Sequence, residues 1–558
     1  MNTRVFMNVI TVRQVGGVLA LAAFLMAAPA HAQTDTGRKD DQSRPILQLS
    51  LDDAVRRAVD NNPDLAVVRL GVEVETARVS ESRSAYVPMF STTFGRSSSA
   101  TPPSNVFVGD QSVDVHDLFS STGVRQRLPW GSGTWSLSWD TARTTTNNPI
   151  TSFDPSLQSG FELAFSQPLF RDRTIDAARQ QYTIAKRNEE SSDLRFREAM
   201  VQTVAAVKQA YWNLKASLAN VTVQQRSLEL AEELARENKV RVGAGQNPPL
   251  DSVQAEAEVA QRRENLIRAR TVAADAEDAL RRLIVDPGDA AFWRVQIDPT
   301  EEPTVISAPL DVDAAVAKAL GERYDLARAG YDLANAKTNA DFFRNQRLPD
   351  VRLETSYRGS GLAGTQFLHS GGFPGVLTGT RNLGFGDALS QAFSNDFPTW
   401  SVGLTVSYPL GKSYESASLV QANVERRQAE KRIASLRIQA AETVRRAGRQ
   451  IQSSAERVEA ARAGAALAEE RLQSEQRRYE VGLSTTFLVT QAQRDLLEAQ
   501  VNLLQTTLDH ESALVNFEAV QQAPPLESGD SGAGGAGVFQ LPTPTPRGVF
   551  RPGAAAGF

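Results

Sequence analysis

The sequence contains one arrangement of segments twice, and this internal duplication restricts the possible folds more than any other feature. SLDDAVRRAVDNNPDLA at residues 50–66 aligns without gaps with DVDAAVAKALGERYDLA at residues 311–327. The same offset places Pro88 over Pro349. The chain is therefore predicted to fold as two tandem copies of one plan.

Further landmarks repeat in the same order. FELAFSQPLF aligns with VGLTVSYPLG, which places Pro168 over Pro409, and two later Val-Gly pairs place Gly243 over Gly482. Because proline and glycine interrupt regular structure, each half is predicted to run helix, proline, strands, proline, long helix, Val-Gly break and second helix. The four prolines then mark the junctions between helices and strands.

This plan predicts the boundaries of every segment. The first repeat covers residues 49–284, with strands at about 88–168, a long helix at 171–241 and a helix at 250–284. A connector covers residues 285–310. The second repeat covers residues 311–523, with strands at about 349–409, a long helix at 412–480 and a helix at 487–520.

The strand regions alternate apolar and polar residues with a period of two. In SVGLTVSY, for example, Val402, Leu404 and Val406 alternate with small or polar residues. This pattern fits any half-buried sheet, and it also fits a barrel that faces lipid with its apolar side. Both interpretations stay open at this point.

The first strand region is longer than the second. Pro88 and Pro168 are 80 residues apart, whereas Pro349 and Pro409 are 60 apart. The stretch GVRQRLPWGSGTWSLSWD at residues 123–140 accounts for the excess and predicts an added hairpin that turns at residues 130–133. This hairpin either lengthens a loop or adds strands to the sheet.

Both long helices carry apolar residues at alternating spacings of three and four, which is typical of coiled-coil packing. One seam consists of Met200, Val204, Val207, Tyr211, Leu214, Leu218 and Val221, and the other of Val444, Ala447, Ile451, Ser454, Val458, Ala461, Ala465, Ala468 and Leu472. The helices before the strands and after the breaks are predicted to line up end to end along each long helix.

The two ends of the chain have different compositions. Residues 1–32 combine an early positive charge, an apolar run and an Ala-His-Ala sequence, which predicts a secretory signal peptide followed by a linker at residues 33–48. Residues 524–558 are rich in proline and glycine and are predicted to form a disordered tail. The chain has no cysteine, and its formal net charge of −5 argues against a nucleic-acid partner.

No catalytic pattern is evident, so no catalytic residue, cofactor or metal site is predicted. His116 and His369 fall in expected surface loops and His510 falls near the end of the last helix. None of them has metal-ligand spacing or a nucleophilic partner in sequence. The carboxylates flank the heptad seams, as solvated helix faces do. The heptads also fit an exported coiled-coil scaffold or adhesin without a pore.

Over residues 49–520 the chain resembles the TolC-like outer-membrane efflux channels, also called outer membrane factors. The resemblance rests on the duplicated plan, the QPL and YPL junctions at Pro168 and Pro409, and YEVGLSTTFLVTQAQRDLLEAQ at residues 479–500. It implies an α+β membrane protein, in which a trimeric outer-membrane β-barrel continues as a long periplasmic α-helical coiled-coil barrel. In that family each chain gives four strands to a twelve-stranded barrel.

The resemblance also implies a function and partners. The chain is expected to be a passive outer-membrane exit channel of a tripartite efflux or type I secretion system. The implied partners are two further copies of the chain, a periplasmic adaptor protein, an inner-membrane pump of the RND, ABC or MFS type, and outer-membrane lipid.

The Val-Gly breaks correspond to the periplasmic tip of such channels. The resemblance implies an adaptor-docking tip composed of Val242, Gly243, Gly245, Val481, Gly482, Leu483, Ser484 and Thr485. The implied candidates for the pore entrance or gate are Tyr479, Asp251, Ser252, Leu488 and Gln491.

The residues after the breaks depart from the family pattern. Leu488 and Gln491 stand where many members carry aspartates that form acidic rings, and Ser484 stands where some carry arginine. Asp251 is expected either to form a weaker ring or to cap the second helix of the first repeat as a solvated N-cap. The docking surface is thus predicted to be retained and the acidic ring to be lost or moved.

Overall fold

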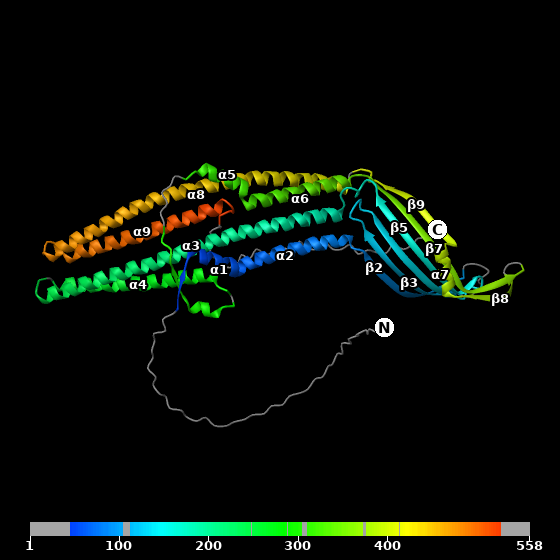
Figure 1. Ribbon diagram of the computed structural model, residues 1–558, viewed down its shortest axis with the longest axis horizontal. Helices are drawn as coiled ribbons and strands as arrows, with labels where there is room; N and C mark the ends of the chain where they lie inside the picture. Colours follow the sequence, from blue (N-terminus) through cyan, green and yellow to red (C-terminus); the bar gives the residue numbers. More distant parts are fainter. Residues whose placement is uncertain are drawn as a thin grey trace, which may run out of the picture. The chain divides into compact units, whose positions relative to one another are not determined.

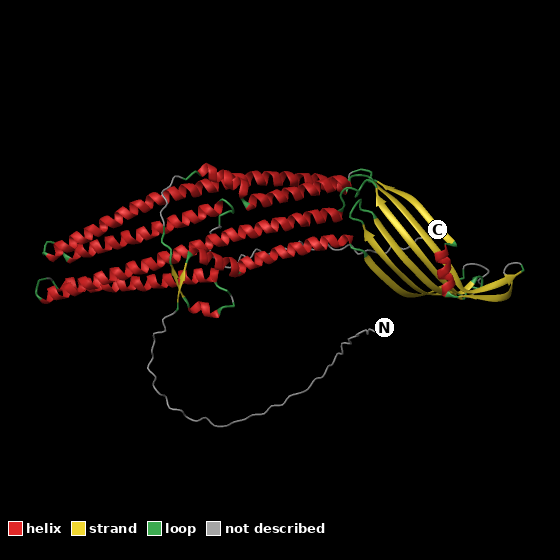
Figure 2. Ribbon diagram, viewed as in Figure 1, coloured by secondary structure: helices red, strands yellow, loops and turns green. Residues whose placement is uncertain are grey.

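The computed structural model describes residues 45–103, 112–246, 248–286, 288–303, 310–371, 375–411 and 413–525. The predicted signal peptide, most of the predicted linker and the predicted tail from residue 526 lie outside the described residues. Figure 1 labels the helices and strands along the chain, and Figure 2 colours them by type.

Four helices form the framework of each repeat. In the first repeat they are α1 (Leu51–Asn61), α2 (Pro63–Arg83), α3 (Ala177–Gly243) and α4 (Pro249–Ile284). In the second they are α5 (Val312–Glu322), α6 (Tyr324–Gln346), α8 (Tyr414–Glu480) and α9 (Thr486–Val520). The long helices α3 and α8 have 67 residues each, which corresponds to about 100 Å of helix.

The short helices line up along the long ones, as the sequence predicts. Both α2 and α4 pack against α3, and both α6 and α9 pack against α8. Figure 1 shows the two members of each pair following one another along the long helix. Each repeat therefore presents two helical layers along its whole length.

The predicted start of the first long helix, at residue 171, is six residues too early. α3 begins at Ala177 because Asp176 caps it, accepting a hydrogen bond from the backbone N–H of Arg179 at 2.9 Å. The residues before it form a turn in which Asp172 has a φ of 65°. A hydrogen bond connects this turn to the predicted hairpin turn at residues 130–133: Ser132 donates to the Asp172 carbonyl oxygen at 2.7 Å.

The middle of the helical part contains a tightly packed core. Tyr211 is fully buried there, and its hydroxyl donates to the Leu49 carbonyl oxygen at 3.0 Å. Leu49 ends strand β1 (Ile46–Leu49), which pairs in parallel with β6 (Gln296–Pro299) from the connector. The short helix η2 (Ala290–Arg294) precedes β6. The connector is thus fixed to the start of the first repeat.

All other strands form one antiparallel sheet. They are β2 (Met89–Thr101), β3 (Val113–Arg127), β4 (Thr134–Thr146), β5 (Phe153–Pro168), β7 (Asp350–Ser370), β8 (Val376–Leu383) and β9 (Phe397–Ser407). A 3-10 turn, η1 (Ser84–Tyr86), connects α2 to β2. The strand order is β2-β3-β4-β5-β7, and the far edge of β7 pairs with β9 and, beyond it along β7, with β8.

The added hairpin contributes two strands to this sheet. β3 and β4 are 15 and 13 residues long, and all but two residues of each pair with β2 and β5, respectively. Six long strands therefore lie side by side, and the family expectation of four per chain is wrong for this protein. The turn between β3 and β4 lies at the predicted place, where Gly131 and Ser132 both have positive φ.

The helix α7 (Phe385–Ser394) was not predicted from the sequence. It packs on β5 and β7, and a Cβ added at Gly359 would lie 2.6 Å from the Ala392 carbonyl oxygen.

Two expectations for histidines were also wrong, because His116 lies within β3 and His369 within β7. Strand pairing across the sheet extends further than the local sequence around them indicates.

Among the described residues, no helix combines the length and the apolar composition that crossing a membrane requires.

Candidate functional site

The two Val-Gly breaks are helix-ending turns with the same hydrogen bonds. At the end of α3, the N–H of Gln246 donates to the Arg241 carbonyl oxygen at 2.9 Å and that of Gly245 to Val242 at 3.0 Å. At the end of α8, Leu483 donates to Arg478 at 2.8 Å and Gly482 to Tyr479 at 3.1 Å. This pair of bonds defines a Schellman motif, in which the first residue after the cap is left-handed.

The geometry corrects the sequence alignment of the two breaks. Gly245 and Gly482 have φ values of 75° and 77°, whereas Gly243 is the last helical residue of α3. Gly245 is therefore the structural counterpart of Gly482, two residues later than the sequence comparison placed it. Sequence alignment missed this because it matched the two Val-Gly pairs. In the first turn this pair lies two residues before the left-handed glycine, whereas in the second turn it contains that glycine.

A buried polar cluster lies directly behind the second turn. Tyr479 is almost fully buried, and its hydroxyl donates to the side-chain oxygen of Asn238 in α3 at 2.7 Å. Thr486, the first residue of α9, donates to the same oxygen at 2.9 Å. This cluster joins the α8–α9 hairpin to the α3–α4 hairpin.

Arg241 adds a second link between the two hairpins. Its guanidinium carbon lies 4.2 Å from the centroid of the Tyr479 ring, and its Nη1 donates to the Tyr479 carbonyl oxygen at 3.3 Å. A cation over an aromatic face is worth about 1 kcal/mol or more when it is partly desolvated. Tyr479 is thus held by α3 at both its ring and its backbone.

Apolar side chains surround this polar cluster. The core behind the turns consists of Leu234, Leu472, Tyr479, Val489, Ala492 and Leu496. Tyr479 was an entrance candidate implied by the family resemblance, whereas Asn238, Thr486 and Arg241 were not predicted. The signal for Asn238 was an amide at a buried position of the coiled-coil seam, which typically specifies register or pairing.

Asp251 does not cap α4. The N-cap residue is Pro248, which has no side-chain hydrogen bond, and Asp251 lies in the first turn of the helix, half-buried. Its carboxylate lies 3.5 Å from the Thr486 hydroxyl, whose shorter hydrogen bond goes to Asn238. The expectation of a solvated N-cap was therefore wrong, because α4 begins at Pro249, two residues before Asp251. Ser252 follows it and is also half-buried.

The other residues after the second turn lie on α9. Thr485 caps this helix by accepting from the N–H of Leu488 at 3.4 Å, and Leu488 itself is 44% exposed. Gln491 donates to Asp495 at 2.7 Å, and Asp495 pairs with Arg471 of α8 at 2.6 Å. The side chain of Ser484 donates to Glu475 of α8.

A buried ion cluster lies further along the helices from the turns. Glu258 of α4 pairs with Arg262 of the same helix at 2.5 Å and with Arg494 of α9. Burial alone would raise the pKa of Glu258, but its hydrogen bonds with the two guanidinium groups outweigh burial and hold the pKa below its usual value. This carboxylate was not recognised from the sequence because the helix carries many charges with no distinguishing spacing.

The turns also expose large apolar side chains. In the second turn Val481 is 70% exposed, Leu483 80% and Phe487 66%. Beside the first turn Leu250 and Val253 are 61% and 62% exposed. Val242 is half-buried, whereas Gly243 and Gly245 are exposed. Clusters of exposed apolar residues commonly mark interaction surfaces.

The four prolines lie where helices and strands meet. Pro88 and Pro349 directly precede β2 and β7, Pro168 ends β5, and Pro409 follows the end of β9 by two residues. A backbone hydrogen bond connects the two repeats beside these junctions, since the N–H of Leu169 donates to the Val351 carbonyl oxygen at 2.8 Å.

The sequence model of one protein family, described as outer membrane efflux protein, matches residues 54–284 and 315–520. The chain belongs to this family. The two matched stretches together cover most of the chain and correspond to the two structural repeats.

Solved structures share the fold of this efflux protein at low sequence identity. A membrane protein from Pseudomonas aeruginosa is 18% identical, with a TM-score of 0.61, over 90% of this chain and 98% of that one. The outer-membrane channel CmeC from Campylobacter jejuni is 17% identical, with a TM-score of 0.60, over 86% and 87% of the two chains. VceC from Vibrio cholerae is 16% identical, with a TM-score of 0.58, over 85% and 96%. No curated protein sequence matches the chain significantly.

Family membership decides between the two functions left open by the sequence. The efflux protein is an outer-membrane exit channel, in which a β-barrel continues as a periplasmic helical barrel. Channels of this family are trimers and work with an adaptor and an inner-membrane pump. It is a passive transport duct. Nothing supports the alternative of a scaffold without a pore.

Proposed function

We propose that the two Schellman turns form the surface on which the periplasmic adaptor docks, and that the contacts behind them hold the entrance closed. The docking surface comprises Val242, Gly243, Gly245 and residues 481–485. The entrance residues comprise Tyr479, Asp251, Ser252, Leu488 and Gln491.

The docking proposal is supported by the exposure of apolar side chains at a turn that a rigid core supports. Leu483 is 80% exposed, although Tyr479 only four residues earlier is almost fully buried. The glycines at the turns leave the backbone accessible, and a Cβ at Gly245 or Gly482 would have no neighbour within 4 Å. A partner backbone can therefore approach closely, and an apolar helical hairpin fits this surface.

The gating proposal is supported by the shared acceptor at Asn238. Two hydroxyl groups from the α8–α9 hairpin bond to this one side chain of α3, in a fully buried position. Moving the hairpins apart breaks both bonds and the contact between Arg241 and Tyr479. Since each neutral hydrogen bond contributes about 1 kcal/mol, adaptor binding has to supply a few kcal/mol to open the entrance.

The proposal extends to the remaining partners. Energy for export would come from an inner-membrane pump of the RND, ABC or MFS type, and the apolar face of the sheet would contact outer-membrane lipid. The chain itself would catalyse no reaction.

The test is photo-crosslinking in intact cells from a benzoylphenylalanine placed at Val481. A periplasmic adaptor is expected in the adduct, and a probe at Leu467 on the same helix should give none. The adduct should disappear in Leu483→Glu and persist in Gln246→Glu, which adds the same charge beside the first turn without removing an apolar side chain. Equal adaptor adducts from both probes, or an adduct that survives Leu483→Glu with normal trimer levels, would contradict the docking surface.

A further inference from the structure

The sheet of this chain is wider than the four strands of the related channels, and its two edges are open. β2 pairs with β3 on one side only, and β9 pairs with β7 on one side only, among the described residues. From β2 to β9, with both edge strands included, six strands lie next to one another without interruption.

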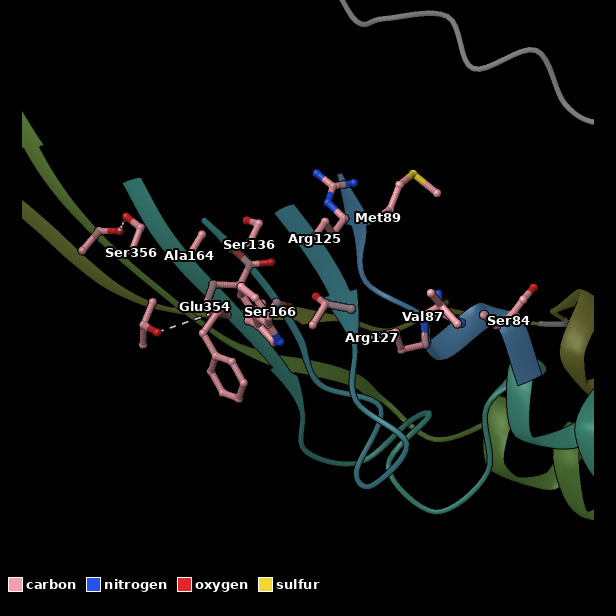
Figure 3. A pocket seen from close by; sticks show the side chains of 16 residues that line it. Ser84, Val87, Met89, Arg125, Arg127, Ser136, Ala164, Ser166, Glu354 and Ser356 are labelled. Carbon is pink, nitrogen blue, oxygen red and sulfur yellow. Dashed lines mark hydrogen bonds between the residues drawn. The ribbon is translucent and has the colours of Figure 1, made fainter. Parts of the chain in front are cut away.

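A single row of residues shows that all six strands belong to one surface. Met89, Arg125, Ser136, Ala164, Ser356 and Ser401 are successive register partners from β2 to β9. All six line one hollow of about 790 Å³. Figure 3 shows the five that it labels coming from neighbouring strands around this hollow.

The opposite side carries a matching apolar row. Its members are Phe90, Val124, Leu137, Leu163, Tyr357 and Trp400, again successive register partners across the six strands. Leu137 on β4 is 46% exposed, as is expected for a side chain that faces lipid. β3 and β4 thus follow the same polar-inside and apolar-outside pattern as the four strands common to the family.

All six strands are long enough to cross a membrane. The shortest, β9, has 11 residues and the others have 13 or more. A tilted membrane-spanning strand needs about 9–11 residues. The added hairpin is therefore neither an extracellular loop nor a plug.

An open strand edge cannot persist in lipid, because each unpaired backbone group there costs several kcal/mol. The directions of the two edge strands allow them to pair between neighbouring copies. β2 leads away from the helices and β9 leads back towards them, so joining β2 of one copy to β9 of the next continues the antiparallel order. The antiparallel order continues from one copy to the next because each chain contributes an even number of strands.

We propose that three copies of the chain close an eighteen-stranded barrel, in which β2 of each copy pairs with β9 of the next. The proposal depends on the trimeric export channel of the family and is independent of the adaptor-docking surface. With strands about 4.8 Å apart and tilted by about 40°, eighteen strands give a backbone radius of about 18 Å, against about 12 Å for twelve. Barrels of this size contain a water-filled channel.

The row described above places three serines, Ser136, Ser356 and Ser401, and the charged Arg125 on the lumen side of the wider barrel. The helical part retains two long and two pairs of short helices per chain, so the added width is confined to the barrel. The structure thus points to an exit whose barrel passes larger solutes than a twelve-stranded one once the tip is open. The limiting diameter then lies in the helical part.

The test uses cysteine pairs in the full chain, which has no cysteine of its own. Lumen-facing positions Ser91, Thr93 and Ser97 of β2 are each changed to Cys and combined with Ser401→Cys, Gly403→Cys or Thr405→Cys of β9. Neighbouring antiparallel strands have Cα atoms about 4.5–5.5 Å apart, within the range of a disulfide. Oxidation of purified trimers should convert most chains to covalent dimers and trimers on a denaturing gel.

A control pair distinguishes this barrel from a twelve-stranded one. Ser91→Cys with Glu162→Cys joins β2 to β5, which lie three strands apart, or about 14 Å, in the six-stranded sheet. This pair should not link. An intrachain β2–β5 disulfide, an intrachain β2–β9 disulfide, or no interchain link across the panel would each overturn the proposal.

Strand counting gives an independent measurement. Electron cryomicroscopy of the trimer should show eighteen strands, and twelve would contradict the proposal. A variant in which an Asn-Gly turn replaces residues 102–152 lacks β3 and β4 and joins β2 directly to β5. It should show twelve strands and a barrel radius about one-third smaller. Because purified trimers are used, failure of adaptor docking would not affect either result.

Discussion

Tyr479 of α8 donates a hydrogen bond from its hydroxyl to the side-chain oxygen of Asn238 in α3, over 2.7 Å, and both residues are buried. The two residues are 241 positions apart in sequence and belong to different repeats. The bond therefore connects two helical hairpins that have no covalent connection near the tip. Its position directly behind the turn couples the shape of the turn to the separation of the hairpins.

Removing this hydroxyl should loosen the closed entrance. Tyr479→Phe eliminates one hydrogen bond of about 1 kcal/mol, which corresponds to about a fivefold increase in the open population. Single-channel recordings of the purified trimer in planar bilayers should show openings at least about five times as frequent, because each of the three chains loses this bond. Tyr414→Phe, on an exposed tyrosine at the other end of α8, is the control and should leave the recordings unchanged. Identical recordings for both variants would exclude a gating role for Tyr479.

The glycines of the first turn should differ in their response to alanine. Gly245 has a left-handed backbone, so Gly245→Ala should destabilise the tip by about 1–2 kcal/mol. Gly243 is helical, and Gly243→Ala should stabilise the end of α3 by about 0.5–1 kcal/mol. Hydrogen exchange of amides in the last two turns of α3 measures both effects. Gly482→Ala should behave like Gly245→Ala, and the reverse ranking of Gly243 and Gly245 would refute the structural equivalence.

The ion cluster at Glu258 should make stability sensitive to acid. Because the pKa of Glu258 is lower in the folded state than in the unfolded state, its contribution is present above pH about 4.3 and is lost as the pH falls further. Glu258→Ala leaves the buried Arg262 without its carboxylate and should cost about 3 kcal/mol at pH 7. Thermal unfolding of the trimer between pH 3 and pH 7 measures both effects.

A neighbouring exposed carboxylate provides the control for this experiment. Glu256→Gln on the same helix should shift neither the melting temperature at pH 7 nor its decline in acid. Glu258→Gln should flatten the decline between pH 5 and pH 3. An unchanged acid profile in Glu258→Gln would show that the cluster does not contribute to acid sensitivity.

The buried His510 should produce a second pH dependence in a higher range. Burial lowers the pKa of His510, its Nδ1 lies 3.0 Å from the Ser454 hydroxyl, and its Nε2 has no hydrogen-bond partner among the described residues. The unfolded chain therefore binds a proton more readily, so stability should fall as the pH drops below about 6.5.

His510→Leu should remove that dependence. Ser454 also donates to the Ile451 carbonyl oxygen at 2.9 Å, so the substitution leaves the hydroxyl satisfied. The melting temperature should become constant between pH 7 and pH 5.5, whereas His369→Gln on the exposed end of β7 should retain the wild-type slope. A slope that persists in His510→Leu would assign the pH dependence to other groups.

Local patterns in the chain were sufficient to predict most elements. Heptad spacing placed α3 and α8, since side chains three and four positions apart share a helix face. Alternation placed strands such as β9, and the glycine-rich stretch at residues 130–133 placed the turn between β3 and β4. The predicted boundaries were wrong where distant contacts act. At Ala177, for example, α3 starts late because the preceding residues form the turn that contacts Ser132 through Asp172, and Asp176 then caps the helix.

Three features depended on contacts between segments far apart in sequence. The sequence left open whether the added hairpin joins the sheet, because alternation specifies a two-sided strand but not its neighbours; pairing of β3 with β2 and of β4 with β5 decided it. The equivalence of Gly245 with Gly482 required backbone dihedral angles. The position of Asp251 beside Thr486 and the partner of Tyr479 required the second hairpin to lie beside the first, because a side chain's environment is set by the segments that the fold brings against it.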